Sequence, residues 1–131
     1  MQAIVLASTS RWRLQLLKDA GIDAIAEPPA VDETLIVGST PTETARMRAI
    51  AKAEAVLARC GDSLVIGADQ VIHLDGVTIG KPTDAEDWLN RLRSMKGRVH
   101  QLTTAVAMLD SHGLDAFDVH TGVRFRSDLT D

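Results

Sequence analysis

Acidic and basic side chains follow several predicted strands and turns of this chain, in a pattern suited to phosphate chemistry. Asp69 stands in the stretch Val65-Ile66-Gly67-Ala68-Asp69-Gln70-Val71, where Gly67 and Asp69 interrupt an apolar run. Cleaving a phosphoanhydride requires cations that neutralise oxygens, carboxylates that hold a divalent metal, and a group that orients or deprotonates water. Asp69 can serve the second and third needs. The other candidates are Ser8, Arg13, Lys52 and Lys81 for phosphate, and Glu33 for the metal.

Each of these residues also has an ordinary structural explanation. Lysine and arginine on a helix are usually solvated, and a glutamate in a loop often contacts no ligand. An aspartate beside a glycine often forms a turn, although the predicted burial of Asp69 weighs against this, because an unpaired carboxylate is costly to bury. On residue types and spacing alone, the prediction stops at a phosphate site.

Other functional classes lack their usual patterns. The chain has neither a Walker A motif nor a dinucleotide-binding glycine fingerprint, and its four histidines lack metal-type spacing. A net charge of −4 without a basic block argues against a nucleic-acid polymer as partner. No apolar run approaches the roughly 20 residues that span a bilayer, and no basic segment follows Met1, so we expect no membrane segment and no signal peptide. Cys60 is the only cysteine, which fits a reducing, cytoplasmic compartment.

The predicted elements indicate one α/β domain over residues 1–131, with a mixed, twisted sheet flanked by helices. Their order is β-α-α-β-β-α-β-β. The expected strands are Ala3–Ala7, Leu64–Ile66, Val71–Leu74, Val77–Ile79, Val99–Leu109 and Val119–Arg126, where Val71–Leu74 resumes the strand that breaks at Gly67. The expected helices begin at Ser10, Thr40 and Thr83, and they end near Gly21, Gly61 and Gly97, respectively.

The first strand is expected to lead through a Ser/Thr turn into a helix. Ser10 is a suitable N-cap, since its hydroxyl can accept a hydrogen bond from a backbone N–H of the first turn. Free N–H groups at a helix start bind phosphate well. Ser8 and Arg13 would therefore stand beside an anion site.

A series of short motifs runs along the chain. They are Leu6-Ala7-Ser8-Thr9-Ser10-x-Trp12-Arg13, Val31-Asp32-Glu33-Thr34, Lys52-Ala53, Ile66-Gly67-Ala68-Asp69-Gln70-Val71, Leu74-Asp75-Gly76, Gly80-Lys81-Pro82 and Gly97-Arg98-Val99-His100. In their order and spacing they resemble the motifs of the Maf family of nucleotide pyrophosphatases. The resemblance extends over about residues 4–126.

The resemblance implies a Maf/ITPase-like fold and metal-dependent hydrolysis of a nucleoside triphosphate to the monophosphate and pyrophosphate, with Mg²⁺ or Mn²⁺ as the cation. It places the catalytic aspartate at Asp69 and the phosphate contacts of the first loop at Ser8 and Arg13. Other charged positions of the family fall on Glu33, Lys52 and Lys81, in agreement with the metal role of Glu33 and the phosphate roles of the two lysines given above.

Two positions point to a branch within the family. Trp12 and Gln70 look like those of the 7-methyl-GTP pyrophosphatase branch, whereas a branch acting on dTTP and UTP carries arginine and threonine there. Methylation makes the guanine cationic, and an indole face attracts a flat cation by roughly 0.5–2 kcal/mol. A glutamine offers both a donor and an acceptor to a base edge.

Members of the family continue well beyond the segment that matches residues 123–129. They add a helix, glycine-rich active-site elements and closing strands. We therefore expect exposed sheet edges that favour a homodimer, and a cleft more open to water. The alternatives to an active enzyme on 7-methyl-GTP are a catalytically impaired nucleotide-binding remnant, an oligomeric interaction protein and, within the enzyme class, a dTTP/UTP pyrophosphatase.

Overall fold

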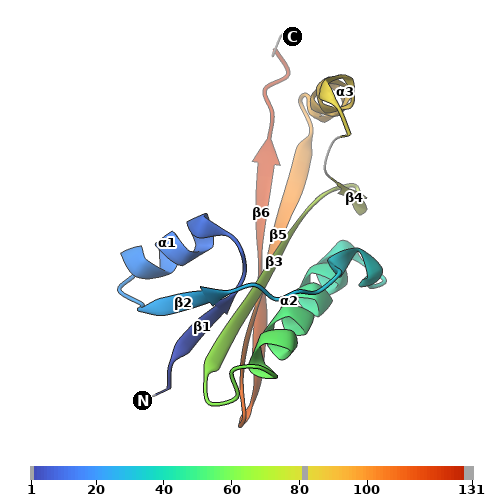
Figure 1. The fold of residues 1–131 in the computed structure, drawn as a ribbon. Coiled ribbons are helices and arrows are strands. Elements are labelled where there is room, and N and C mark those ends of the chain that lie inside the picture. The colour runs from blue at the N-terminus through green and yellow to red at the C-terminus, as the bar shows by residue number, and fades with distance from the viewer. Residues whose placement is uncertain (1, 81–82, 129–131) are drawn as a thin grey trace.

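A computed structural model describes residues 2–80 and 83–128. Its centre is a six-stranded mixed sheet (Figure 1). The elements in chain order are β1 (Ile4–Ala7), α1 (Arg11–Asp19), β2 (Ala24–Glu27), the short 3₁₀ helix η1 (Glu33–Leu35), α2 (Pro41–Leu57), β3 (Leu64–Leu74), β4 (Val77–Ile79), α3 (Ala85–Met95), β5 (Val99–Asp110) and β6 (Gly113–Arg124).

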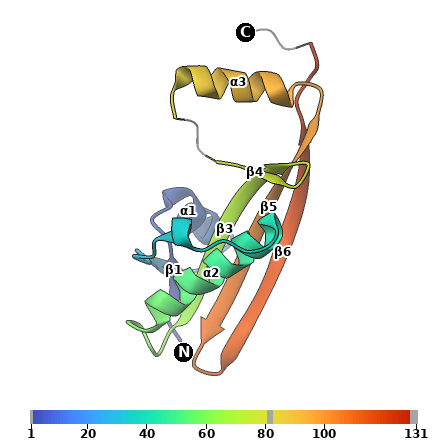
Figure 2. The ribbon, with the colours of Figure 1, turned by 90° about the vertical axis from the view of Figure 1, so that its right-hand side faces the viewer.

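The strand order is β2-β1-β3-β5-β6, with β4 paired to the end of β3. β1 runs parallel to β2 and β3. β3 is antiparallel to β4 and β5, and β5 is antiparallel to β6. Figure 2 shows α2 along one face of the long strands and α3 beyond the end of the sheet, past β4. The predicted α/β class with a mixed sheet is confirmed.

α2 packs closely on the sheet because alanines fill its inner face. Its buried residues meet small side chains of β1, β3 and β5, and the core cluster is Val5, Ala7, Ala45, Ala49, Ala53, Val56, Val65, Val71, Ala105 and Ala107. Side chains this small allow two backbones to approach each other more closely than leucine or isoleucine would. The site residue on α2, Lys52, is therefore held near the sheet.

β3 runs without a break through Gly67, so the predicted interruption is wrong. The glycine serves a different purpose. A Cβ added to Gly67 would lie 2.1 Å from the carbonyl oxygen of Ala49 on α2. Gly67 thus permits the helix to lie against the strand, and Asp69 is placed inside a strand rather than after one.

The N-caps at Ser10 and Thr40 are confirmed, since each hydroxyl accepts a hydrogen bond from the backbone N–H three residues later. α3 is capped by Asp84, one residue later than the predicted Thr83, because a carboxylate is a strong N-cap acceptor. Within the described residues, no helix is long and apolar enough to cross a membrane.

Two further strands differ from the prediction. β2 was absent from the expected strands, because a strand of four residues whose central side chains are exposed carries almost no alternation signal. It forms through its parallel register with β1. β6 begins at Gly113 rather than near Val119, because Asp110 and Gly113 pair across a tight turn and the hydrogen-bonded pairing of β5 with β6 therefore continues up to that turn.

Candidate functional site

Lys52 joins two carboxylates that come from distant parts of the chain. Its Nζ lies 3.1 Å from Asp69 Oδ1 on β3 and 2.8 Å from Glu33 Oε2 on η1. The same ammonium donates a hydrogen bond to the carbonyl oxygen of Ala68, 3.2 Å away. Asp69 reaches Lys52 because its side chain points to the face of β3 that α2 covers.

The two carboxyl groups differ in acidity because their surroundings differ. Asp69 is only 6% exposed, and this burial raises the pKa of its carboxyl more than the Lys52 ammonium lowers it. Glu33 is half-exposed, and close contact with the Lys52 ammonium lowers the pKa of its carboxyl despite partial burial. Asp69 is therefore the better proton acceptor of the pair.

Asp69 Oδ2 is buried and lacks a hydrogen-bond donor among the described residues. Glu33 Oε2 is also buried, and the Lys52 ammonium 2.8 Å away is its ion-pair partner. Buried acceptors without a donor are costly, and hard divalent cations bind such oxygens.

These two residues fit a magnesium or manganese ion held by one or two carboxylates, with substrate phosphates supplying other ligands. In the described part of the chain, no group of three or more acidic, histidine or cysteine side chains has the arrangement of a metal centre. These described residues alone do not provide a full ligand set, so a cation here would depend on the substrate for further ligands.

The turn from β1 to α1 forms the opposite wall of the site. Ser8 is buried, and its Oγ accepts a hydrogen bond from the backbone N–H of Ser10 at 3.0 Å. Arg13 crosses from α1 to the sheet, where its guanidinium donates to Ala68 O at 3.3 Å. Lys52 and Arg13 thus converge on one carbonyl from two different helices.

These groups surround a polar cleft of about 520 Å³. A strand end, a helix start, η1 and α2 all contribute to it, and it contains both carboxylates and two cations. The residues that line it are Ala7, Ser8, Thr9, Ser10, Arg13, Pro28, Pro29, Ala30, Val31, Glu33, Lys52, Asp69 and Gln70.

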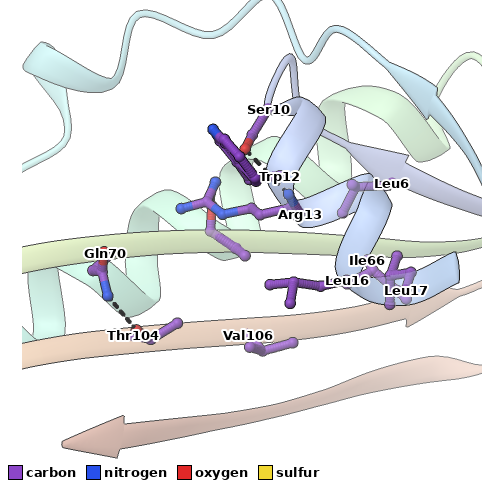
Figure 3. A pocket seen from close by; sticks show the side chains of 11 residues that line it. Leu6, Ser10, Trp12, Arg13, Leu16, Leu17, Ile66, Gln70, Thr104 and Val106 are labelled. Atoms are coloured by element: carbon purple, nitrogen blue, oxygen red, sulfur yellow. Dashed lines mark hydrogen bonds between the residues drawn. The ribbon is translucent and has the colours of Figure 1, made fainter. Parts of the chain in front are cut away.

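A second cavity of about 590 Å³ lies between α1 and the face of β3 and β5 that is turned away from α2 (Figure 3). Arg13, Ser10 and Gln70 line both cavities, so the two are adjacent. Trp12 stands at its rim with 82% of its surface exposed. The remaining lining is mostly apolar and comprises Leu6, Leu16, Leu17, Ile66, Ala68, Thr104 and Val106.

The structure brings together all but one of the predicted site residues. Ser8, Arg13, Glu33, Lys52 and Asp69 line the polar cleft, and Trp12 and Gln70 line the apolar cavity. The predicted phosphate contact at Lys81 lies outside the described residues.

Two residues near the site were missed from the sequence. Arg48 lies one turn before Lys52 on α2, donates to Ile36 O at 3.0 Å, and lowers the pKa of both carboxyl groups. Residues four apart lie on the same face of a helix, so the position of Arg48 four residues before Lys52 could have identified it from the sequence. Thr104 meets Gln70 only through the register of β3 and β5, for which the sequence offers no local signal.

Residues 3–131 match the family model described as "Maf-like protein". The chain is 47% identical over 109 residues to a nucleoside triphosphate pyrophosphatase of Synechococcus sp., covering 82% of this chain and 55% of that protein. It is 42% identical over 133 residues to a 7-methyl-GTP pyrophosphatase of Paraburkholderia xenovorans, covering 98% of this chain and 64% of that protein. The chain therefore spans less than two thirds of the length of these relatives.

A solved structure supports the fold. The Staphylococcus aureus Ham1 protein superimposes with a TM-score of 0.66, covering 96% of this chain and 73% of that chain. The sequence identity of that pair is 23%. At this level the likeness shows a common fold, which agrees with the expected Maf/ITPase-like class.

Proposed function

The chain belongs to the Maf-like protein family, and on that premise we propose that it is a metal-dependent nucleoside triphosphate pyrophosphatase, with 7-methyl-GTP as its preferred substrate. The observation that carries the proposal is the cluster of Asp69, Lys52 and Glu33, in which a buried carboxylate with a raised pKa faces a polar cleft. The activity is that of a hydrolase acting on an acid anhydride.

The polar cleft suits a triphosphate. Arg13 and Lys52 bring two positive charges to it from two different helices, and Ser8 lies in the turn that opens α1. Cations beside a phosphate chain neutralise the charge that develops on its oxygens. We assign Lys81 to the same task on the basis of the sequence, since it lies outside the described residues.

Asp69 is proposed as the general base. Burial raises the pKa of this carboxyl, which increases its affinity for a proton from water. The water oxygen then attacks the phosphorus nearest the ribose, the anhydride bond breaks, and pyrophosphate leaves with the electron pair. A bound Mg²⁺ or Mn²⁺ would supply Lewis acidity, and carboxylate oxygens of Asp69 and Glu33 would hold it.

The adjacent apolar cavity suits the base. Trp12 provides an indole at the rim, and Gln70 provides an amide on the floor. An indole face attracts the cationic ring of a methylated guanine by roughly 0.5–2 kcal/mol. This pairing supports 7-methyl-GTP over dTTP and UTP.

The test is pyrophosphate release from a panel of 7-methyl-GTP, GTP, dTTP and UTP with Mg²⁺ or Mn²⁺. We expect release that is fastest with 7-methyl-GTP and lost in Asp69→Asn, which removes the charge and keeps the shape. Release that persists in this variant would contradict the role of Asp69. Binding by calorimetry without any release would favour the catalytically impaired remnant.

The branch assignment has its own test. The double variant Trp12→Arg with Gln70→Thr should shift the preference towards dTTP, because it installs the residues of the other branch. The matched control is Val37→Arg, which adds the same charge at an exposed position outside both cavities. A preference for dTTP in the unmodified protein would overturn the assignment.

We also propose self-association as a homodimer and a cytoplasmic location. Among the described strands, β6 lies at one edge of the sheet and carries half-exposed Phe117 and Val119, and unpaired edges favour association. Light scattering that finds a stable monomer would contradict the homodimer. The single thiol of Cys60 is compatible with a reducing compartment.

A further inference from the structure

Gln70 and Thr104 form a side-chain pair on the floor of the apolar cavity. The antiparallel register of β3 and β5 places the two residues directly opposite each other. The Nε2 group of Gln70 donates a hydrogen bond to Thr104 Oγ1 at 3.0 Å. Both side chains line the cavity, together with Leu16 and Val106.

This contact determines what the glutamine can offer to a ligand. Gln70 is exposed, and a free glutamine amide would rotate and present its oxygen and nitrogen interchangeably. With Nε2 held by Thr104, the oxygen lies on the other side of the amide, as Figure 3 shows. One acceptor and one remaining N–H are then left for a ligand.

We propose that Thr104 is a positioning residue that fixes the amide of Gln70 for base recognition, an inference that rests on the proposed function. Presented in this way, the amide oxygen accepts from a ring N–H and the remaining N–H donates to the adjacent carbonyl. The cavity therefore selects bases with an oxo group beside a ring N–H, as in guanine and hypoxanthine. Adenine has an amino group beside a bare ring nitrogen and presents the reverse pattern.

A site that reads a base through oriented hydrogen bonds discriminates against a base with the reverse pattern, because each polar group of the amide would then face a group of its own kind. Leu16 and Val106, which line the cavity beside the pair, are apolar and offer the base no alternative hydrogen-bond partner. Thr104 would thus contribute to selectivity without touching the phosphates or Asp69.

Inosine triphosphate and ATP are suitable probes, because their bases differ mainly at this edge. We expect the protein to favour inosine triphosphate over ATP in kcat/KM and in Kd. Thr104→Val keeps the shape and removes the hydroxyl, so it should reduce that preference by about fivefold, in line with one lost hydrogen bond. Thr104→Ser should restore it, because serine keeps the acceptor.

Gln70→Ala is the reference variant. It should remove the preference, and adding Thr104→Val to it should change nothing further, since the two residues act as one unit. A preference lost in Gln70→Ala but retained in Thr104→Val would overturn the positioning role. A natural preference for ATP would overturn the assigned orientation of the amide.

A measurement on the free protein tests the hydrogen bond directly and shows in the same spectrum whether the variant is folded. The side-chain amide of Gln70 should give two well-separated proton resonances in the nuclear magnetic resonance spectrum, and they should move together in Thr104→Val while the backbone resonances keep their dispersion. Unchanged side-chain resonances would contradict the hydrogen bond. Equal preference in every variant would refute this inference and leave pyrophosphatase activity standing, whereas no binding of either nucleotide would overturn both.

Discussion

Replacing Asp69 by asparagine should make the free protein more stable while it removes activity. Asp69 is 6% exposed, and Oδ2 has no hydrogen-bond donor among the described residues. Burial raises the pKa of the carboxyl even though Lys52 is 3.1 Å from Oδ1. The folded protein therefore favours an uncharged side chain at this position.

The expected gain for Asp69→Asn at neutral pH is about 1 kcal/mol of unfolding free energy. A buried unpaired acceptor costs about 1–3 kcal/mol, and the low end applies because the lost ion pair with Lys52 offsets part of the benefit. Lys52 keeps Glu33 as a partner at 2.8 Å, so the substitution does not leave the ammonium alone.

The gain should depend on pH in one direction. A carboxyl whose pKa is raised by folding adds stability below its ordinary value of 3.8, and this stability is lost as the pH rises through the raised pKa. The stability difference between Asp69→Asn and the unmodified protein should therefore be near zero below pH 3.8 and reach its full size once Asp69 is ionised in the folded state.

Urea unfolding of both proteins at a series of pH values measures this difference. Glu33→Gln is the matched control, because the Lys52 ammonium lowers the pKa of Glu33, so that this substitution should destabilise the protein instead of stabilising it. The unfolding free energy at neutral pH should fall by only about 0.3–0.5 kcal/mol, since Glu33 is half-exposed to water. An Asp69→Asn protein that is less stable than the unmodified one at neutral pH would refute the reasoning and show that the ion pair outweighs burial.

Three further substitutions test the packing and the site. Gly67→Ala should lower the unfolding free energy by about 3 kcal/mol or more, because the new Cβ would lie 2.1 Å from Ala49 O. Thermal unfolding measures this loss. A loss of less than about 1 kcal/mol would contradict the close approach of α2 to the strand. Thr103→Val should lower the free energy of unfolding, measured in urea, by about 1–3 kcal/mol. The buried Thr103 hydroxyl lies 3.0 Å from His73 Nε2 and 2.9 Å from His120 Nδ1, and valine would leave these two ring nitrogens without it as a partner. Trp12→Ala should leave the melting temperature unchanged, since Trp12 is 82% exposed, and should weaken 7-methyl-GTP binding by about 2-fold to 30-fold in calorimetry. An unchanged affinity would place the base elsewhere.

Local signals explain why much of the fold was predictable. Ser10 and Thr40 cap their helices as expected, because an N-cap needs only a hydroxyl and the backbone three residues later. The order of the predicted helices and strands indicated an α/β class, which the structure confirms. These features depend on residues near one another in the chain, so the sequence carries them directly.

The sequence alone determined which residues could do chemistry, because residue type and order are sufficient to propose Asp69 with Lys52 and Glu33. Only the tertiary structure decided how they act on one another. η1, α2 and β3 meet at Lys52, and burial there reverses the effect that a neighbouring ammonium alone would have on Asp69. Burial and register join residues far apart in the chain, so no local pattern encodes them. The same reason hid Thr104, which meets Gln70 only across the β3–β5 ladder.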